Sequence, residues 1–261
     1  MSRQQNPLIQ VKDLKKYYPV KTGIIPHVTD YVKAVDGVSF SIYEGEILGL
    51  VGESGCGKTT IGKLLTGLEK PTEGAILYRG MDILDWTAKE QKKYRTKIQM
   101  IFQDPYSSLN PAWTVGRILR EPLILSGVKD KNELTGRVND MLLRVGLDET
   151  YARRRPSQLS GGQRQRISIA AALIARPRLI IADEPLSALD VTIQAQIMKL
   201  LLELKNELGL TYIFISHDID VVYQMCDRIM VMKDGHVIES GETEELFSDP
   251  KEAYTRQLIE G

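Results

Sequence analysis

A glycine-rich segment between an apolar run and a helix-like stretch carries the clearest chemical signal in the sequence. It consists of Gly52, Glu53, Ser54, Gly55, Cys56, Gly57, Lys58, Thr59 and Thr60. Glycines let successive backbone N–H groups turn inward around phosphate oxygens, and the N-terminus of the following helix favours an anion. Lys58 adds a point charge and the Thr59 hydroxyl a ligand for Mg²⁺. This strand–loop–helix context predicts a phosphate-binding loop for a nucleoside triphosphate.

Two carboxylates stand at the predicted end of another apolar strand. The run 179–182 is followed directly by Asp183 and Glu184. In open α/β sheets, ligands bind at the carboxyl ends of the strands. We therefore predict that Asp183 holds Mg²⁺, directly or through water, and that Glu184 acts on the attacking water as general base.

Two further polar residues follow strand-like runs. Gln103 ends the run 98–102, and its amide can ligate Mg²⁺ or orient water. His217 follows the run 211–216, where its imidazole can hydrogen-bond the γ-phosphate. A lone histidine is usually structural, but His217 is one of several polar residues predicted at strand ends on the same edge of the sheet. This favours a catalytic role. His27 and His236 have no such context.

A second candidate anion site precedes a predicted helix over 163–175. It consists of Ser160, Gly161, Gly162 and Gln163. Serine and glycine at a helix N-terminus leave backbone amides available to an anion. The nucleotide site still lacks a cover, and this turn is the candidate for it.

The elements that position these residues form three blocks along the chain. The first hundred residues indicate short strands, the middle has helical spacing, and the last part alternates strands with helices. We expect residues 19–31 to form a loop or extended hairpin tip. The predicted strands cover 8–14, 32–42, 47–51, 75–78, 179–182, 211–216, 229–232 and 236–239, and the predicted helical segments cover 59–67, 90–97, 115–125, 133–145, 151–155, 163–175, 192–208 and a stretch from 219. Such alternation predicts a parallel core sheet with a helical insertion.

Composition limits the classes of function. The 261 residues hold 34 basic and 34 acidic side chains, so no overall positive field attracts nucleic acid or anionic lipid. Two cysteines, Cys56 and Cys226, are too few for a disulfide framework or a Cys-rich metal cluster. Cys56 lies at the start of the loop helix, and two interpretations stay open: a thiol with a lowered pKa, or a small residue that only fills the loop. The N-terminal segment 1–7 lacks the apolar region of a secretory signal, and no apolar run reaches the roughly 18 residues of a membrane span. We expect a cytoplasmic chain.

Together and in this order, the motifs resemble those of the ATP-binding subunits of ABC transporters. The resemblance covers nearly the whole chain and adds Tyr18, which it assigns to adenine stacking. It implies ATP and Mg²⁺ as cofactors, catalysis by Glu184, His217 and Gln103, and Mg²⁺ ligation by Thr59, Gln103 and Asp183. It also implies head-to-tail pairing of two domains. Each Ser-Gly-Gly turn, Ser160 to Gln163, then caps the γ-phosphate of the other chain, with Ser187 and Asp190 at the seam.

The same resemblance implies the fold and its division. We expect an α/β P-loop NTPase core of the ABC ATPase type. Its sheet is mainly parallel, with an N-terminal antiparallel β-subdomain and an inserted α-helical subdomain. The single domain 1–261 then divides into a catalytic part, 1–103 with 177–261, and a helical part that carries the Ser-Gly-Gly turn, 104–176.

Within the family, several segments are similar to the oligopeptide, dipeptide and nickel importer branch. They are 102–111, 114–115, 121–123, 187–196 and 254–258. The branch implies import of peptides or related solutes at the inner face of the cell membrane. Its partners are a second ATPase chain, homologous or identical, two transmembrane permeases and an extracytoplasmic solute-binding protein. The chain departs from the branch at 251–253, where His-Pro is usual before the tyrosine, and at Ala171, where arginine is common.

Other functions stay open at this point. The same machinery imports nickel or another metal chelate in some members, and the sequence does not select the solute. A soluble ABC ATPase of DNA repair or translation, and an exporter ATPase, are further alternatives. A GTPase switch is disfavoured because the guanine-selecting Asn-Lys-x-Asp is absent.

Overall fold

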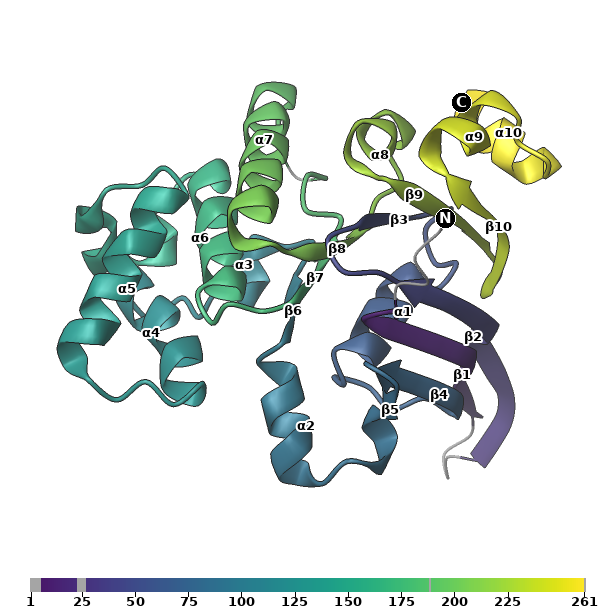
Figure 1. Cartoon of the computed structure of the whole chain (residues 1–261), viewed down its shortest axis with the longest axis horizontal. Coiled ribbons are helices and arrows are strands. Elements are labelled where there is room, and N and C mark those ends of the chain that lie inside the picture. Colours follow the sequence, from purple (N-terminus) through teal and green to yellow (C-terminus); the bar gives the residue numbers. More distant parts are fainter. Residues whose placement is uncertain (1–5, 23–26, 188, 261) are drawn as a thin grey trace. The chain divides into compact units, whose positions relative to one another are not determined.

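The computed structural model describes residues 6–22, 27–187 and 189–260, with Pro105 and Ser107 described by their backbone alone. The chain divides into two compact units (Figure 1). The first unit combines Met1–Gln91 with Ile213–Gly261, and the second is Lys92–Tyr212. The predicted division into 104–176 and the remainder stays a prediction. Among the described residues, no helix is both long and apolar enough to cross a bilayer.

An antiparallel sheet in the order β2-β1-β4-β5 forms one part of the first unit. Its strands are β1 (Ile9–Thr22), β2 (His27–Ile42), β4 (Glu73–Tyr78) and β5 (Met81–Asp82). Ile9 lies opposite Ile42 on one side and Tyr78 on the other. The apolar residues Ile9, Val11 and Leu14 are buried, as expected of a strand between two neighbours. This confirms the predicted antiparallel N-terminal part.

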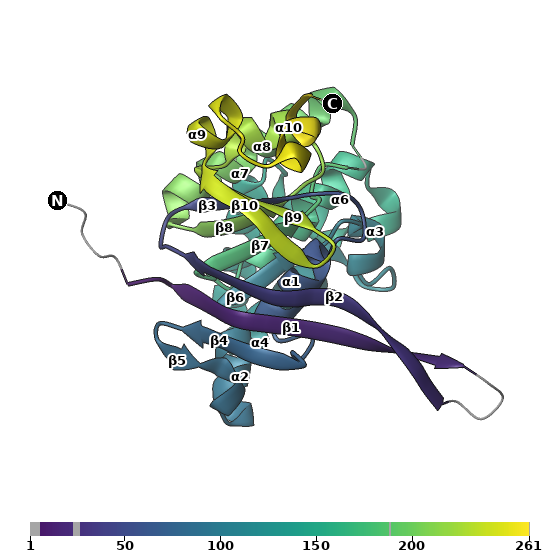
Figure 2. The ribbon, with the colours of Figure 1, turned by 90° about the vertical axis from the view of Figure 1, so that its right-hand side faces the viewer.

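Of the two alternatives predicted over 19–31, the extended hairpin tip is confirmed and the irregular loop is wrong for most of its length. β1 continues to Thr22 and β2 begins at His27, so that the two strands form a long ribbon (Figure 2). β-branched and aromatic residues supply the strand preference there, including Val20, Thr22 and Val28. Residues 23–26, the rest of the predicted loop, lie outside the described residues.

The first unit also holds three neighbouring strands in the order β10-β9-β3. The next strand in the sheet, on the other side of β3, is β8. β3 (Ile47–Val51) is buried throughout and runs parallel to β9 (Arg228–Lys233). β10 (His236–Glu242) is antiparallel to β9, and β8 (Thr211–Ile215) starts at the end of the second unit. The other elements of this unit are α1 (Lys58–Leu65), η1 (Ile83–Asp85), α8 (Ile219–Met225), α9 (Thr243–Ser248) and α10 (Ala253–Glu260).

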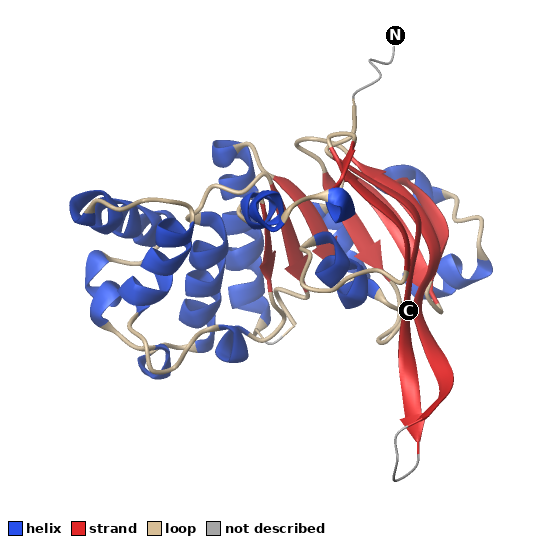
Figure 3. Ribbon diagram, turned by 90° about the horizontal axis from the view of Figure 1, so that it is seen from below, coloured by secondary structure: helices blue, strands red, loops and turns tan. Residues whose placement is uncertain are grey.

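The second unit pairs β6 (Ile98–Ile101) with β7 (Leu179–Asp183) in parallel. Its helices include α4 (Val115–Leu125), α5 (Lys131–Arg144) and α6 (Gly161–Leu173), which pack against one another (Figure 3). The remaining elements are α3 (Pro105–Ser108), η2 (Glu149–Arg153), η3 (Pro156–Gln158) and α7 (Val191–Leu208), while α2 (Ala88–Arg95) crosses the boundary between the units. Parallel strands joined through helices confirm the predicted α/β class.

Side-chain caps explain where these helices begin. Thr114 accepts a hydrogen bond from Arg117 N and starts α4, and Asp130 accepts one from Glu133 N and starts α5. Such caps satisfy amides of the first turn that have no partner within the helix. At the other end, Gly209 closes α7 in the left-handed conformation, directly after the helix predicted over 192–208. The segment 151–155 is not regular helix: a 3-10 turn covers Glu149–Arg153 instead.

Candidate active site

The glycines of the predicted phosphate loop differ in how closely the rest of the chain packs on them. Gly52 and Gly57 have φ of 147° and 110°. A Cβ on Gly52 would lie 2.1 Å from the Met232 carbonyl oxygen, and one on Gly57 would lie 2.1 Å from that of Ala34. These two glycines are therefore required by the packing of the chain itself. Gly55 has φ of 84°, but a Cβ there would meet nothing within 4 Å.

The open side of the loop suits an anion. Ser54, Gly55 and Thr59 are exposed where β3 leads into α1. Gly57 occupies the N-cap of α1 and carries no side chain that could cap the first-turn amides. A helix N-terminus of this kind favours phosphate oxygens. The residues present therefore fit the triphosphate that the sequence predicts.

The lysine of the loop is almost completely buried and is held in place. Lys58 has 4% of its surface exposed. Its Nζ donates to the carbonyl oxygens of Gly52 at 2.7 Å and Glu53 at 2.8 Å. Two carbonyl acceptors fix the direction of the ammonium group, so its charge is placed before any ligand arrives.

The thiol beside this lysine does not have the lowered pKa that one interpretation of the sequence predicts. Cys56 is buried, and its burial raises the thiol pKa although the nearby Lys58 charge acts in the opposite direction. The expectation of a lowered pKa is wrong because desolvation of the thiolate outweighs the helix start and the lysine.

Tyr18 of β1 is half-buried. Its hydroxyl donates to a carboxylate oxygen of Glu69, and Lys16 Nζ lies 5.0 Å from its ring centroid. Burial raises the pKa of Tyr18, the bond to Glu69 adds to the rise, and a contact with the Thr60 hydroxyl opposes it. Thr60 belongs to the predicted phosphate loop, so Tyr18 reaches the edge of that loop.

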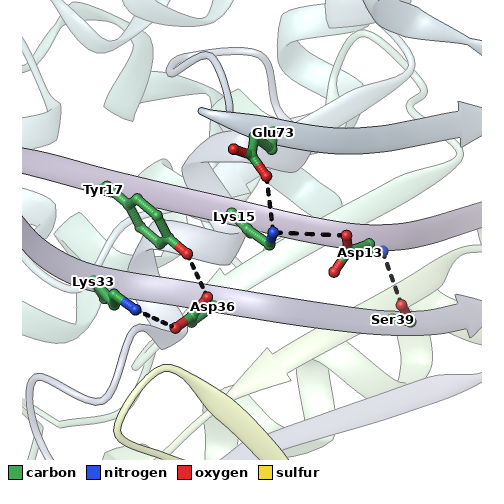
Figure 4. A network of polar contacts seen from close by, with 7 residues as sticks. All are labelled: Asp13, Lys15, Tyr17, Lys33, Asp36, Ser39 and Glu73. Carbon is green, nitrogen blue, oxygen red and sulfur yellow. Dashed lines mark hydrogen bonds and ion pairs between the residues drawn. The ribbon is translucent and has the colours of Figure 1, made fainter.

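The neighbouring tyrosine is engaged elsewhere. Tyr17 donates to Asp36 Oδ1 at 2.5 Å, and Lys33 Nζ lies 3.2 Å from Asp36 Oδ2 (Figure 4). Successive residues of a strand point to opposite faces, which separates Tyr17 from Tyr18. Of the two aromatic residues, Tyr18 is the one that contacts the phosphate-loop helix.

In the second unit, the predicted base meets the predicted glutamine. Gln103 Nε2 donates to Glu184 Oε2 at 2.8 Å. Asp183 is 4% exposed at the end of β7, and Glu184 follows with a φ of 46°. A left-handed glutamate is strained, and such strain gathers at functional positions. Ser187 Oγ donates to the Glu184 carbonyl oxygen at 3.1 Å and braces this turn.

The Ser-Gly-Gly turn begins α6 through reciprocal capping. Ser160 Oγ accepts from Gln163 N at 3.3 Å, and Gln163 Oε1 accepts from Ser160 N at 3.0 Å. A Cβ on Gly162 would lie 2.9 Å from Ile193 Cγ2, so α7 limits that position. α7 itself starts at Asp190, which accepts from Ile193 N at 3.0 Å.

Gly161 has no such internal reason to be glycine. It is exposed, its φ lies outside the left-handed region, and a Cβ there would meet nothing within 4 Å among the described residues. An alanine would fit the described structure without strain. A requirement for glycine here would come from a group outside the described residues that approaches this face of the turn.

His217 is exposed directly after β8, in the first unit. The preceding Ser216 N donates to the Leu50 carbonyl oxygen at 3.3 Å, on the strand that leads into the phosphate loop. The following Asp218 caps α8 through Val221 N at 3.1 Å. Within this unit, His217 is therefore fixed at the carboxyl end of the strand beside β3.

The predicted site residues thus form two groups. The first unit brings together the phosphate loop, Tyr18 and the strand end at His217, and the second joins Gln103 to Glu184. Thr59 lies in the first unit and Asp183 in the second, so their convergence on one Mg²⁺ stays a prediction.

One contact to the phosphate loop is missed by sequence reasoning. Glu53 N donates to Tyr254 Oη at 3.0 Å, across 201 positions of sequence. The only signal for it in the sequence is the tail segment 254–258, which is similar to the importer branch but carries no chemistry of its own.

Comparison with known proteins decides the family. A family model described as ABC transporter matches residues 35–187, more than half of the chain. The chain belongs to the ABC transporter family. Among its ABC relatives is the dipeptide transport ATP-binding protein DppF of Escherichia coli, 48% identical over 255 residues that cover 98% of this chain and 76% of that protein. The oligopeptide transport ATP-binding protein AppF of Bacillus subtilis is 48% identical, with 98% and 78% covered.

A solved ABC structure gives the same result for the fold. It is described as a dimeric, post-hydrolysis state of the ATP-binding cassette MJ0796 bound to ADP and phosphate. The TM-score is 0.79 at 35% identity, with 90% of this chain and 98% of that chain covered. The chain has the ABC ATPase fold and is an ATPase of that family.

Proposed function

We propose that the chain is the ATP-hydrolysing subunit of a peptide importer in the cytoplasmic membrane. The observation that carries this is the 48% identity to DppF over 98% of the chain, since the name of that relative refers to dipeptide transport. AppF, whose name refers to oligopeptides, supports the same class of solute. The solute class is therefore peptides of short length.

In this function the phosphate loop of the first unit binds the triphosphate. The exposed residues Ser54 and Gly55 and the start of α1 donate their backbone N–H groups to the phosphate oxygens. Lys58, fixed by two carbonyl groups, directs its charge at the β- and γ-phosphates. Tyr18 stacks on the adenine. Its contact with Thr60 supports this role, because it places the tyrosine at the edge of the phosphate loop.

Glu184 takes the proton of the attacking water. Gln103, which donates to its carboxylate at 2.8 Å, orients Glu184 and the water. His217 hydrogen-bonds the γ-phosphate from the end of β8. We assign Thr59, Gln103 and Asp183 to Mg²⁺ from their places in the family motifs. A bound Mg²⁺ supplies neutralisation of the charge that develops on the phosphates.

A second cassette completes the site. Ser160, Gly161, Gly162 and Gln163 of one chain cap the γ-phosphate held by the other. Gly161 supports this because nothing within the described chain needs a glycine there. Ser187 and Asp190 lie along the seam, and dimeric MJ0796 is a precedent for two paired cassettes. ATP then favours the closed pair, because its contacts to both chains form only when the pair is closed. Hydrolysis removes the γ-phosphate contacts, and the pair opens.

The further partners follow from the importer assignment. They are two transmembrane permeases and an extracytoplasmic solute-binding protein, so the chain works at the inner face of the membrane. The second ATPase chain is identical or homologous. Import of nickel or a metal chelate by the same machinery is the alternative solute class.

Purification of the tagged chain from solubilised membranes of its own cells tests the proposal. We expect it to co-purify with two permeases and a second ATPase chain, and we expect its ATPase rate in vesicles to rise when a binding protein loaded with a short peptide is added. Stimulation by a nickel chelate and not by peptides would contradict the solute class. Recovery with ribosomes or DNA and without permeases would contradict transport.

A further inference from the structure

The C-terminal helix reaches into the phosphate loop through one side chain. Tyr254 of α10 accepts a hydrogen bond from Glu53 N at 3.0 Å. The carbonyl oxygen of the same Glu53 accepts from Lys58 Nζ at 2.8 Å. One loop residue is therefore held by the tail through its N–H and by the phosphate-binding lysine through its C=O.

The helix that presents Tyr254 is anchored to β10. Glu239 Oε1 accepts from Lys251 N at 2.8 Å, and Glu239 Oε2 accepts from Glu252 N at 3.1 Å. These two amides immediately precede α10, and a carboxylate there satisfies groups that have no partner within the helix. Arg256 braces the same turn, donating from Nε to the Pro250 carbonyl oxygen at 2.9 Å. The position of Tyr254 is thus set by bonds to the sheet.

The turn between β9 and β10 contacts both the tyrosine and the loop. Lys233 Nζ lies 4.6 Å from the Tyr254 ring centroid, within the range of a cation–π contact. Gly235 N, two residues further on, donates to the Cys56 carbonyl oxygen at 3.1 Å. Tyr254 is half-buried, and burial raises the pKa of its phenol, so the hydroxyl stays neutral at physiological pH.

We propose that Tyr254 is a positioning residue of the nucleotide site. It fixes the Gly52–Glu53 peptide, because it accepts from the Glu53 N–H, and the Gly52 carbonyl oxygen of the same peptide accepts from Lys58 Nζ at 2.7 Å and holds the ammonium toward the phosphates. The C-terminal helix is then part of the machinery that binds ATP. This inference rests on the proposed function, since it assumes that the loop binds ATP.

The alternative is that α10 only stabilises the fold, and a matched pair of variants separates the two. Tyr254→Phe keeps the ring and removes the acceptor for Glu53 N. Tyr223→Phe is the control: Tyr223 donates to Glu244 Oε2 at 3.2 Å, and its ring centroid lies 4.7 Å from that of Phe247 in a tilted arrangement. Each variant removes one tyrosine hydroxyl, with its hydrogen bonding, from the first unit.

The measurement is ATP affinity of the purified full-length chain by titration calorimetry, with kcat and KM from phosphate release. Loss of one hydrogen bond that acts through the loop raises Kd by about threefold to tenfold in Tyr254→Phe. We expect KM to rise with it, kcat at saturating ATP to stay within about twofold of wild type, and Tyr223→Phe to bind as wild type does.

An unchanged Kd in Tyr254→Phe, with wild-type ATP binding intact, would overturn this inference and leave the proposed function standing. An equal rise of Kd in both variants would also overturn it, because a general loss of stability then explains the effect. Failure of the wild-type chain to bind ATP would remove the proposed function and this inference with it.

Discussion

Replacement of Gly161 by alanine separates the needs of the fold from those of a second chain. Gly161 is the first residue of α6, and an added Cβ meets nothing within 4 Å. Alanine is better than glycine within a helix by up to about 1 kcal/mol. We therefore expect Gly161→Ala to keep or raise the melting temperature, by roughly 2–4 °C per kcal/mol for a chain of this size.

Gly161→Ala lowers ATP turnover, although it does not lower stability, if the Ser-Gly-Gly turn covers a nucleotide held by the other chain. An added methyl group keeps the other chain from closing fully, and a displacement of about 1 Å at a reacting group lowers the rate by about 10²-fold. Gly136, exposed on α5, is the matched control because a Cβ there also meets nothing within 4 Å. Gly136→Ala raises stability by the same mechanism and leaves turnover unchanged.

The assays are differential scanning calorimetry and phosphate release at saturating ATP, with wild type and both variants at equal concentration. Wild-type turnover in Gly161→Ala would refute the reasoning, because nothing then packs on the turn. A melting temperature well below wild type would refute it as well, since glycine would be serving the fold of this chain.

Three further predictions concern the loop and the base. Glu184→Gln lowers turnover by about 10²-fold or more and leaves ATP binding intact; phosphate release at the wild-type rate would show that another group is the base. Cys56 has a pKa raised by burial, so iodoacetamide labels it much more slowly at pH 8 in the native chain than in urea. The thiol pKa of Cys56 is higher in the folded chain than in the unfolded chain. The contribution of this thiol to the free energy of unfolding is therefore present below the unfolded pKa and is lost as pH rises through the folded pKa. A chain that gains stability over that pH range would contradict the raised pKa. Gly57→Ala, with its Cβ 2.1 Å from the Ala34 oxygen, destabilises more in urea unfolding than Gly55→Ala, which costs about 1–2 kcal/mol of backbone strain; equal losses would contradict the packing argument.

Local signals in the sequence predict much of the fold. The spacing predicts a helix over 115–125, which is where α4 lies, because Thr114 supplies the cap and the apolar residues repeat on one face. Gly209 ends α7 for an equally local reason. The strand before the phosphate loop is visible because Ile47–Val51 is buried on both faces and therefore reads as a continuous apolar run.

Features set by distant neighbours escape such reasoning. Local patterns do not choose between a loop and an extended hairpin tip over 19–31, because that choice depends on pairing between β1 and β2. The Cys56 pKa depends on burial that no local pattern reveals. The bond from Glu53 to Tyr254 spans 201 positions, and a tyrosine in a polar tail gives no sign of its partner.

Turnover per chain, measured as a function of chain concentration, tests the composite ATP site most directly. If Ser160 to Gln163 of one cassette seal the nucleotide of another, turnover per chain falls on dilution, or stays absent until the second ATPase chain is added. A rate per chain that is constant down to high dilution, together with full activity of Ser160→Ala, would contradict that shared site.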